Sequence, residues 1–599
     1  MSAALPPLPI NAILPDVCHA LDKDGACVVH APPGSGKTTR LPLALMDEPW
    51  LCGQKILMLE PRRLATRSAA RHMAGLLGES VGKRIGYLTR LDARTSPRTR
   101  VQVITEGILT RMLQHDPELS GCGCVIFDEF HERSLQADLG LALSLDVRAA
   151  LRPDLRLVIM SATLDVKVMA SLLGGCRTLS CPGQPHPVET RYLRMAETFV
   201  EDRMAKAIRH ALATEHGDIL AFLPGAREIQ RTLELLDNPG PGILFHPLLG
   251  ALTAREQDQA ICPAAPGTRK VVLATAIAET SLTIEGVRVV IDSGLARLPR
   301  FDPRGGMSRL ITEPASLATI EQRRGRAGRT APGVCIRVWD QTDEISRKPF
   351  PTPEILEADL APLALDLALW GTPDPAQLSW PTPPPTGNYQ TAMSLLNRLC
   401  LVDAANRITP HGRAVAELPL HPRLGHMILT AQAHGLGPTA IRLAAILAEP
   451  GQVMRGGSDL REIVNPRTSL PEAVRAGEEQ LFRATTTPPG TIRSEVAGLL
   501  TALAYPDRIA RRQEDGSYRL TNGRKAVWPG PISLASQEFL AIADLDGEAA
   551  SARIWQAAPL EREDLERFFG DIMIWENEIR FDPLKDRVVT LRKRMLGSL

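Results

Sequence analysis

The sequence predicts two successive α/β domains, then helical modules and a small β-domain. Between about residues 25 and 340, short apolar runs alternate with helical stretches, and each run ends in a polar or glycine-bearing loop. Runs that are apolar on both faces are typical of buried parallel strands. Beyond about 345, prolines flank short helical stretches, and from about 513 apolar and polar residues alternate around Asn-Gly and Asp-Gly turns.

Length, composition and net charge indicate several domains and limit the ways in which the protein could bind nucleic acid. The 599 residues exceed one hydrophobic core, since domains average roughly 150 residues. The apolar fraction of 44% with 23% charged residues is ordinary for a globular protein, and aromatic residues make up only 4%. Recognition by stacking many bases is therefore disfavoured. With a net charge of +1, a nucleic-acid binder of this composition must gather its positive charge locally.

The spacing of the cysteines and the hydropathy of the sequence argue against a zinc-binding protein, a secreted protein and a membrane-spanning protein. The ten cysteines show no paired C-x-x-C spacing that would complete a zinc site, so we expect reduced cysteines packed as small apolar residues. The N-terminus has no basic region followed by an apolar core, so we expect no signal peptide. No apolar run approaches the roughly 18 residues of a membrane span. We therefore expect a cytoplasmic protein with no membrane partner.

The expected strands fall into two sets on either side of a turn-rich stretch, CPGQPHPVE, at 181–189. The runs are ACVVH, KILMLE, VQVITE, CGCVIF and LRLVIMS before this stretch, and DILAF, KVVLATAI and VRVVIDSG after it. In parallel α/β sheets the functional groups lie at the carboxyl ends of the strands. We therefore expect the chemistry in the loops that follow these runs.

The C-terminal half has a different character. Residues 356–370 and 430–449 look helical, although prolines or glycines interrupt them, and 496–504 is a short apolar helix. From 513 onward, GSYRLTNGRKAVW, EFLAIADLD and ARIWQAA alternate as half-buried strands do. These patterns predict helical modules first and a small β-domain last.

The stretch APPGSGKTTR, residues 31–40, follows the first strand and fits a phosphate-binding loop. Gly34 and Gly36 let the backbone curl so that successive N–H groups face phosphates. Lys37 supplies a cation for the β- and γ-phosphates, and Thr38 supplies a hydroxyl for Mg²⁺. An ordinary strand–turn–helix is the alternative.

Two adjacent carboxylates end the strand of CVIFDEFHERSL, residues 124–135. Paired acids after an apolar strand are costly unless a cation or a reaction needs them. Beside a phosphate-binding loop, Asp128 is expected to hold Mg²⁺ and Glu129 to orient and deprotonate the attacking water. Surface acids that cap a helix beginning near residue 132 would explain one of the pair only.

The stretch EQRRGRAGRT, residues 321–330, places Arg323, Arg324, Arg326 and Arg329 within seven residues. Such a cluster is usually a solvated charge run, and it also suits a nucleic-acid patch. Glycines at 325 and 328 let guanidinium groups converge on one point. Next to a phosphate-binding loop and an acid pair, we favour two arginine fingers that reach a γ-phosphate from a second domain.

Taken together, the motifs resemble the DEAH-box helicases of superfamily 2. The segments that carry the resemblance are PPGSGKTT (32–39), EPRRLA (60–65), TEGILTR (105–111), DEFH (128–131), SAT (161–163), ATAIAETSLTI (274–284) and QRRGRAGR (322–329). HGRAVAELPLHPRLGHM (411–427) and AYPDRIARR, which begins at residue 504, look most like the bacterial HrpB branch. The resemblance covers almost the whole chain, more loosely after residue 340.

The resemblance implies two tandem RecA-like parallel-sheet domains with ATP between them, followed by winged-helix, helical-bundle and OB-like β domains. The implied limits are 1–182 and 183–348 for the RecA-like domains, 349–424 for the winged helix, 425–512 for the helical (ratchet) bundle and 513–599 for the OB-like domain with the start of a C-terminal region. The stretch 296–310 corresponds to the β-hairpin that helps to separate strands in the family.

It also assigns residues by position. The residues expected to bind nucleotide are Gly34, Ser35, Gly36, Lys37, Thr38, Thr39 and Asp128, with Thr38 and Asp128 on the metal. The expected catalytic residues are Glu129, Gln322, Arg326 and Arg329, and Gln322 would help to position the water. Ser161, Thr163 and His131 would couple hydrolysis to motion, His131 as a relay to the SAT segment. Those expected to line the RNA path are Arg62, Arg63, Thr105, Glu106, Thr280 and Ser281.

The chain departs from the family pattern at several positions. Phe130 stands where the family has alanine, and Ala276 stands where asparagine is usual. Around 258–267 the aromatic that often stacks on adenine is missing, which leaves nucleoside triphosphates other than ATP open. Members of this branch normally continue well beyond LRKRMLGSL, so we expect either a truncated chain or a branch without the C-terminal region.

The resemblance implies a monomeric ATP-dependent RNA helicase or translocase that uses ATP and Mg²⁺ and moves 3′→5′ on single-stranded RNA. A DNA or dual-specificity helicase remains open, because contacts to backbone phosphates do not read the 2′-OH. A nucleotide-switched factor that remodels an RNA–protein assembly without unwinding also remains open. The physiological substrate and any protein partners lie outside what the sequence indicates.

Overall fold

The fold comes from a computed structural model, which describes most of residues 8–599. The residues outside the description are 1–7, 33, 90–91, 164–165, 182–185, 195–196, 238–239, 251, 253, 280–283, 303–305, 450–456, 547–550 and 583–586. The chain divides into two compact units. The first comprises 1–300, 310–358 and 376–384, and the second comprises 301–309, 359–375 and 385–599.

The first unit contains an eight-stranded sheet of order β4-β3-β5-β2-β6-β7-β1-β8. Its strands are β1 (Ala26–His30), β2 (Lys55–Glu60), β3 (Ile85–Leu88), β4 (Ala93–Arg94), β5 (Val101–Thr105), β6 (Cys122–Phe127), β7 (Arg156–Ser161) and β8 (Arg177–Ser180). Every pairing is parallel except that of β3 with the short strand β4. The expected buried parallel strands of this region are confirmed.

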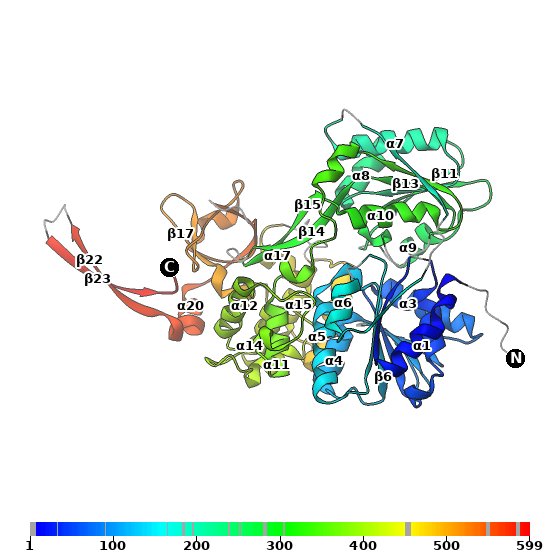
Figure 1. The fold of residues 1–599 in the computed structure, drawn as a ribbon. Helices are drawn as coiled ribbons and strands as arrows, with labels where there is room; N and C mark the ends of the chain where they lie inside the picture. The colour runs from blue at the N-terminus through cyan, green and yellow to red at the C-terminus, as the bar shows by residue number, and fades with distance from the viewer. Residues whose placement is uncertain are drawn as a thin grey trace. The chain divides into compact units, whose positions relative to one another are not determined.

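Helices cover both faces of this sheet, as parallel crossovers require. They are α1 (Leu14–Lys23), α2 (Lys37–Leu45), α3 (Arg63–Leu76), α4 (Glu106–His115), α5 (Leu135–Ala150) and α6 (Val166–Leu172). Apolar side chains of α1, α2 and α3 form one core with residues of the central strands. Figure 1 shows α4 and α5 on the opposite side of β6 from α1 and α3.

The second sheet of this unit has the order β11-β12-β10-β13-β16-β9, and all of its pairings are parallel. Its strands are β9 (Val188–Tyr192), β10 (Asp218–Phe222), β11 (Ile243–Leu248), β12 (Arg269–Ala274), β13 (Val287–Asp292) and β16 (Gly333–Arg337). Its helices are α7 (Val200–Thr214), α8 (Ala226–Leu235), α9 (Ala254–Ile261) and α10 (Leu317–Gly325). Alternate residues of β10 and β12 enter two separate cores, so both faces are buried.

The expected hairpin around 296–310 is also present. Strands β14 (Leu295–Asp302) and β15 (Met307–Pro314) form a two-stranded sheet. The two tandem parallel-sheet domains and this hairpin confirm the predicted architecture of the N-terminal half.

The second unit begins with helices. They are α11 (Ala361–Trp370), α12 (Thr386–Arg398), α13 (Pro410–Ala416), α14 (Pro422–Ala433), α15 (Gly437–Ala448), α17 (Leu460–Val464), α18 (Glu472–Thr485) and α19 (Ala497–Ala504). The helical stretch expected over 430–449, with its internal glycines, consists of the end of α14 and of α15, which separate at Gly435, whose φ is +71°. The helix expected over 356–370 begins only at Ala361, just before Pro362.

A closed barrel of order β17-β18-β19-β21-β20 follows. Its strands are β17 (Ile509–Arg512), β18 (Tyr518–Leu520), β19 (Lys525–Val527), β20 (Phe539–Leu545) and β21 (Ala552–Pro559). Beyond α20 (Arg562–Phe569), β22 (Ile574–Asp582) and β23 (Arg587–Met595) pair with each other and form a long ribbon (Figure 1, red). No described helix is long and apolar enough to cross a lipid bilayer.

Candidate active site

The phosphate-binding loop lies where the sequence predicts it, between β1 and α2. Gly34 and Gly36 have φ of +83° and +92°, a left-handed conformation that residues with a Cβ rarely adopt. Lys37 is the first residue of α2, so the free N–H groups of that helix end point into the loop. Ser35 is buried and Thr39 follows in the first turn of α2.

Lys37 reaches both acids of the DEFH segment. Its Nζ lies 2.8 Å from Glu129 Oε2 and 3.7 Å from Asp128 Oδ1. All three side chains are at least nine-tenths buried. The predicted triad of one cation and two carboxylates is therefore assembled at the carboxyl ends of β1 and β6.

The electrostatic environment distinguishes the two carboxylates. Burial by itself would raise the pKa of Glu129, but Lys37 and then His131 lower this pKa to about 2. Burial raises the pKa of Asp128 to about 6, although Lys37 opposes this. Burial lowers the pKa of Lys37, but Glu129 and Asp128 outweigh that effect and raise it. Glu129 is thus held as a carboxylate next to a permanent cation.

Thr38 and Asp128 form a pair of hard oxygen ligands. Thr38 Oγ1 donates to Asp128 Oδ2 at 2.5 Å, and Asp128 Oδ1 accepts from the N–H of Glu129 at 2.8 Å. In the described residues, no three His, Cys, Asp or Glu side chains are grouped so as to hold a metal. A hydroxyl and one carboxylate still suit Mg²⁺, which keeps several waters and takes phosphate oxygens as ligands.

The backbone of the DEFH turn is strained. Glu129 and Arg133 have φ of 49° and 48° and flank the short 3-10 turn Phe130–Glu132. A left-handed non-glycine residue costs about 1–3 kcal/mol and marks functional sites. The Phe130 ring packs edge-on against Phe127 at 5.9 Å and is buried, so the departure from alanine at this position fills the core.

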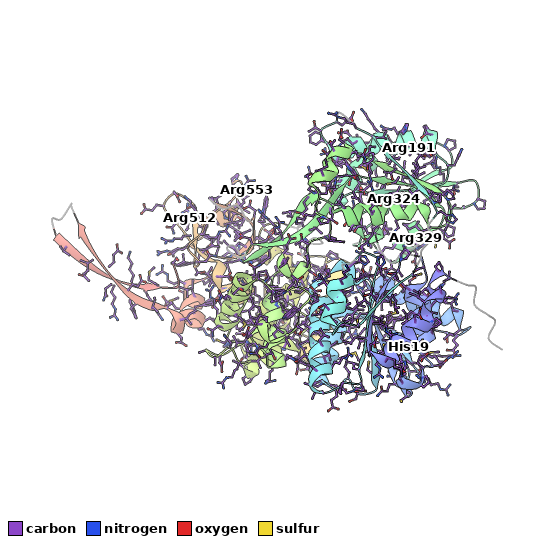
Figure 2. The ribbon with its side chains drawn as sticks, viewed as in Figure 1. His19, Arg191, Arg324, Arg329, Arg512 and Arg553 are labelled. Atoms are coloured by element: carbon purple, nitrogen blue, oxygen red, sulfur yellow. The ribbon has the colours of Figure 1, made fainter. Side chains whose placement is uncertain are left out.

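Residues of the second sheet's domain complete the site. Gln322 Nε2 lies 2.5 Å from His131 Nε2, and His131 Nδ1 lies 3.4 Å from Glu129 Oε2. Arg326 is buried, and Figure 2 shows Arg329 on the side of its domain that faces the first sheet's domain. Burial lowers the pKa of Arg329 to about 10, and the charge of Glu129 opposes this shift. Both arginines therefore lie within electrostatic reach of Glu129.

The other two arginines of the cluster have structural partners. Arg323 is 1% exposed and binds Glu279 through Nε at 2.8 Å and Asp292 through Nη1 at 2.7 Å. Arg324 pairs with Glu321 at 2.7 Å and donates to the carbonyl of Val188. The cluster is therefore divided, and only Arg326 and Arg329 remain near the acid pair.

The expected coupling residues lie at the end of β7 and in the DEFH turn. Ser161, at the end of β7, is fully buried, and its Oγ accepts from Thr163 N at 3.2 Å. The SAT segment contacts the phosphate-loop strand, since Ala162 O accepts from His30 Nε2 and Ser161 O accepts from Ala31 N. Among the described residues, the polar partners of His131 are Gln322 and Glu129. This histidine thus connects DEFH to QRRGRAGR, and its role as a relay to the SAT segment remains a prediction.

The residues expected along the RNA path differ in their exposure and in their contacts. Arg62 donates to Ala276 O at 2.8 Å, and Arg63 is exposed at the start of α3. Thr105 is the N-cap residue of α4. The Glu106 carboxylate is buried and accepts from Ser134 Oγ.

Thr280 and Ser281 lie outside the described residues. An RNA role for this set therefore remains a prediction, and Glu106 is placed as a link between the starts of α4 and α5.

Two acids near the site, Glu60 and Glu279, were not predicted from the sequence. Glu60, at the end of β2, is 1% exposed, and burial together with Asp128 and Glu129 raises its pKa well above the ordinary value. Glu279 binds Arg323 through its carboxylate and Arg326 through its carbonyl. Each lies inside a quoted motif, EPRRLA or ATAIAETSLTI, but a lone acid gives no sign of which cation it will meet.

Comparison with known proteins shows the family to which this chain belongs. The DEAD/DEAH box helicase family matches residues 12–172, and the family described as helicase conserved C-terminal domain matches residues 202–331. The ATP-dependent RNA helicase HrpB of Escherichia coli is 42% identical over 597 residues, which are 99% of this chain and 73% of that protein. The pre-mRNA-splicing factor ATP-dependent RNA helicase prp22 of Schizosaccharomyces pombe is 35% identical over 74% of this chain and 39% of its own length.

Solved structures agree with these matches. A crystal structure of the E. coli DExH-box NTPase HrpB superposes with a TM-score of 0.86 at 42% identity, over 100% of this chain and 74% of that one. A second, of the E. coli DEAH/RHA helicase HrpB, gives a TM-score of 0.87 at 41% identity and covers 99% of this chain and 75% of that one. The chain belongs to the DEAH-box helicases of superfamily 2, which hydrolyse ATP, and within them to the bacterial HrpB branch.

Proposed function

We propose that this ATP-dependent RNA helicase couples Mg-ATP hydrolysis between its two RecA-like domains to 3′→5′ movement on single-stranded RNA. The observation that carries the proposal is the link from Lys37 through Glu129 and His131 to Gln322. It joins the phosphate-binding loop to the other domain through the acid expected to activate water. A change of distance between the domains would therefore act directly on the reacting groups.

In this scheme the loop residues Gly34 to Thr39 bind the triphosphate. Lys37 exchanges its carboxylate partners for β- and γ-phosphate oxygens, and Thr38 with Asp128 holds Mg²⁺. The bound ion supplies charge neutralisation of the phosphates. Opening the Lys37–Glu129 pair leaves the Glu129 carboxylate able to accept a proton from water.

The second domain contributes position and charge. Gln322 orients the water together with Glu129, and Arg326 and Arg329 stabilise charge on the transferred phosphoryl group. Arg326 is buried and Arg329 is half-buried, and the charge of Glu129 acts on both, which supports this role. Hydrolysis would then require both domains to be in contact.

Support for the domain limits comes from the positions of the elements. Strand β8 ends at Ser180 and β9 begins at Val188, on either side of the proposed limit at 182. The helices α11 to α15 fall in the proposed winged-helix and bundle regions, and the barrel begins with β17 at Ile509, slightly before 513. We keep the limits as proposed.

The test compares ATP hydrolysis with RNA and DNA oligomers of equal length, then unwinding of duplexes that carry 3′ or 5′ overhangs. We expect RNA to stimulate hydrolysis more than DNA does, and only 3′-overhang duplexes to be unwound. Equal stimulation by DNA would favour the dual-specificity enzyme. Stimulated hydrolysis without unwinding of either duplex would favour a remodelling factor that responds to nucleotide.

A further inference from the structure

The ribbon formed by β22 and β23 has two chemically different faces. In an antiparallel pair, residues opposite one another share a face and successive residues alternate between faces. Trp575 lies opposite Arg594, Asn577 opposite Arg592, and Ile579 opposite Thr590. We call the face with these residues and Val588 the Trp575 face.

The Trp575 face is basic, aromatic and accessible. Trp575 is 58% exposed, Ile579 is 71% exposed and Val588 is 65% exposed. Arg592 and Arg594 are exposed on it, and the Arg592 guanidinium lies 4.6 Å from the centroid of the Trp575 ring. None of its residues is Asp or Glu.

The opposite face has a different charge balance. Its described residues include Glu576, Glu578 and Lys593, and Lys593 pairs with Glu578. By register, Arg580, Asp582 and Arg587 also lie on that face, so it carries both signs of charge, whereas the two arginines of the Trp575 face meet no carboxylate. Alternation along the ribbon places neighbouring residues such as Arg592 and Lys593 on opposite faces.

We propose that the Trp575 face is an accessory binding site for single-stranded RNA. A base stacks on an exposed aromatic ring without regard to sequence, and arginines bind phosphates and stack on bases as well. Same-face residues on one strand are about 6.8 Å apart, close to the spacing of successive phosphates along an extended strand. Arg592 and Arg594 are related in this way on β23.

A bound ligand would also stabilise the ribbon. Among the described strands, β22 and β23 pair with no other, and a single two-stranded hairpin is marginally stable in water. Apolar side chains as exposed as Ile579 and Val588 mark binding surfaces when they are adjacent. A single-stranded nucleic acid can pair its phosphates with the arginines and place its bases against the apolar side chains of this face.

The choice of RNA rests on the proposed function. The site itself would be separate from the hydrolysis centre, since the ribbon belongs to the second unit and that centre belongs to the first. We expect the site to add affinity for RNA without changing turnover once the protein is saturated with RNA.

The test uses the full chain and a fluorescent single-stranded RNA oligonucleotide in an anisotropy titration at several salt concentrations. Arg592→Ala and Lys593→Ala each remove one positive charge from adjacent positions on opposite faces, so they form a matched pair. Trp575→Ala and Ile574→Ala form a second pair. Thermal melts of all four variants check that the ribbon stays folded, and Trp575→Phe keeps an aromatic ring.

We expect Trp575→Ala to weaken RNA binding by about fivefold or more, since stacking on one ring contributes substantially to affinity. Arg592→Ala should lower the slope of log K against log salt by about 0.7, the loss of one phosphate contact. Ile574→Ala and Lys593→Ala should change affinity by less than about twofold, and Trp575→Phe should restore most of the loss. The turnover number at saturating RNA should be the same in all variants.

Equal effects on the two faces, or no effect on either, would overturn the proposal. A change in molecular mass by light scattering in Trp575→Ala alone would overturn it in favour of a contact between copies of the chain. If the unmodified chain fails to bind RNA at all, the proposed function fails as well. If it binds RNA and the two faces behave alike, only the accessory site is lost.

Discussion

Gln322 Nε2 lies 2.5 Å from His131 Nε2, so one hydrogen bond joins the domains that contain the two parallel sheets. Burial lowers the pKa of His131 to about 4 although Glu129 opposes this, so the ring is neutral at pH 7. The Gln322 amide donates to Nε2, which leaves the ring proton on Nδ1, 3.4 Å from Glu129 Oε2. The His131 ring therefore lies between Gln322 and the expected catalytic base.

Gln322→Ala should reduce RNA-stimulated ATP turnover by about tenfold to a hundredfold, because the water and His131 both lose an orienting partner. The KM for ATP should change by less than about threefold, since no phosphate contact is removed. Steady-state ATPase assays give both values. Arg324→Ala, two residues further along, removes only the contacts with Glu321 and Val188 and should keep normal turnover. A larger loss in Arg324→Ala than in Gln322→Ala would refute the role of the link.

Lys37→Ala and Glu129→Gln should separate binding from chemistry. Glu129→Gln should bind ATP and lose turnover by about 10² or more, because the base is gone while the phosphate contacts stay. Lys37→Ala should abolish detectable ATP binding. It should also lower the melting temperature of the nucleotide-free protein, since two buried carboxylates lose their cation. Binding of a fluorescent ATP analogue and thermal melts measure these effects, and near-normal turnover in Glu129→Gln would rule out the assignment of the base.

Arg326→Ala should mainly lower ATP turnover, whereas Arg323→Ala should mainly lower the stability of the fold. Arg326→Ala should cut turnover by about 10³, as expected of an arginine finger, with a much smaller change in RNA affinity. Arg323→Ala should destabilise the fold by about 3–5 kcal/mol, because Glu279 and Asp292 would remain buried without their partner. Turnover, RNA anisotropy and urea unfolding are measured on both variants. If Arg326→Ala mainly weakens RNA binding, the cluster is an RNA patch.

The buried pair Arg423–Asp507 predicts an acid-sensitive contribution to stability. Two hydrogen bonds of 2.5 and 2.9 Å join the side chains. Burial opposes the shift, but Arg423 brings the pKa of Asp507 to about 2, below the ordinary 3.8. A lowered folded-state pKa contributes stability that is complete above the unfolded pKa and is lost as the pH falls through the folded one. The window is therefore about pH 5 to 2, and the contribution is about 2 kcal/mol.

Urea unfolding of the unmodified chain should accordingly become easier over this window. Asp507→Asn should lose stability at pH 7 and show a flatter pH dependence below pH 5. Asp571→Asn is the control, because Asp571 is exposed at the surface. Equal pH profiles for Asp507→Asn and the unmodified chain would contradict the assignment.

Much of the fold could be predicted because its signals are local. Runs such as CGCVIF and DILAF are apolar on both faces, and they became central strands of the two sheets. Strands such as β11 and β9 were not predicted, because half-exposed edge positions give no continuous apolar run. An interruption within 430–449 was expected, but the pattern alone does not show which of Gly435 and Gly437 separates the two helices.

The candidate site was predictable to the extent that motifs fix their own geometry. The loop glycines, Lys37, Thr38 and the acid pair came together as expected, because each ends a strand of one sheet. The partner of His131 could not be predicted, because it depends on how one domain meets the other. Arg323 and Arg326 look alike in sequence, and only the positions of Glu279 and Asp292 distinguish the structural arginine from the finger.

The two stretches that resemble the HrpB branch contain another contact that the sequence does not predict. Arg423 lies in HGRAVAELPLHPRLGHM and Asp507 lies in AYPDRIARR, and their buried pairing joins the stretches. Each stretch identified the branch, but nothing in either predicts that the other holds its partner.

The central claim is that RNA controls hydrolysis at the Lys37–Glu129 centre. The most direct measurement is steady-state ATP hydrolysis by the unmodified chain and by Glu129→Gln, each with and without single-stranded RNA. We expect RNA to raise the rate severalfold in the unmodified chain, and we expect a rate near zero under both conditions in Glu129→Gln. Hydrolysis that RNA leaves unchanged, or that persists in Glu129→Gln, would contradict this claim.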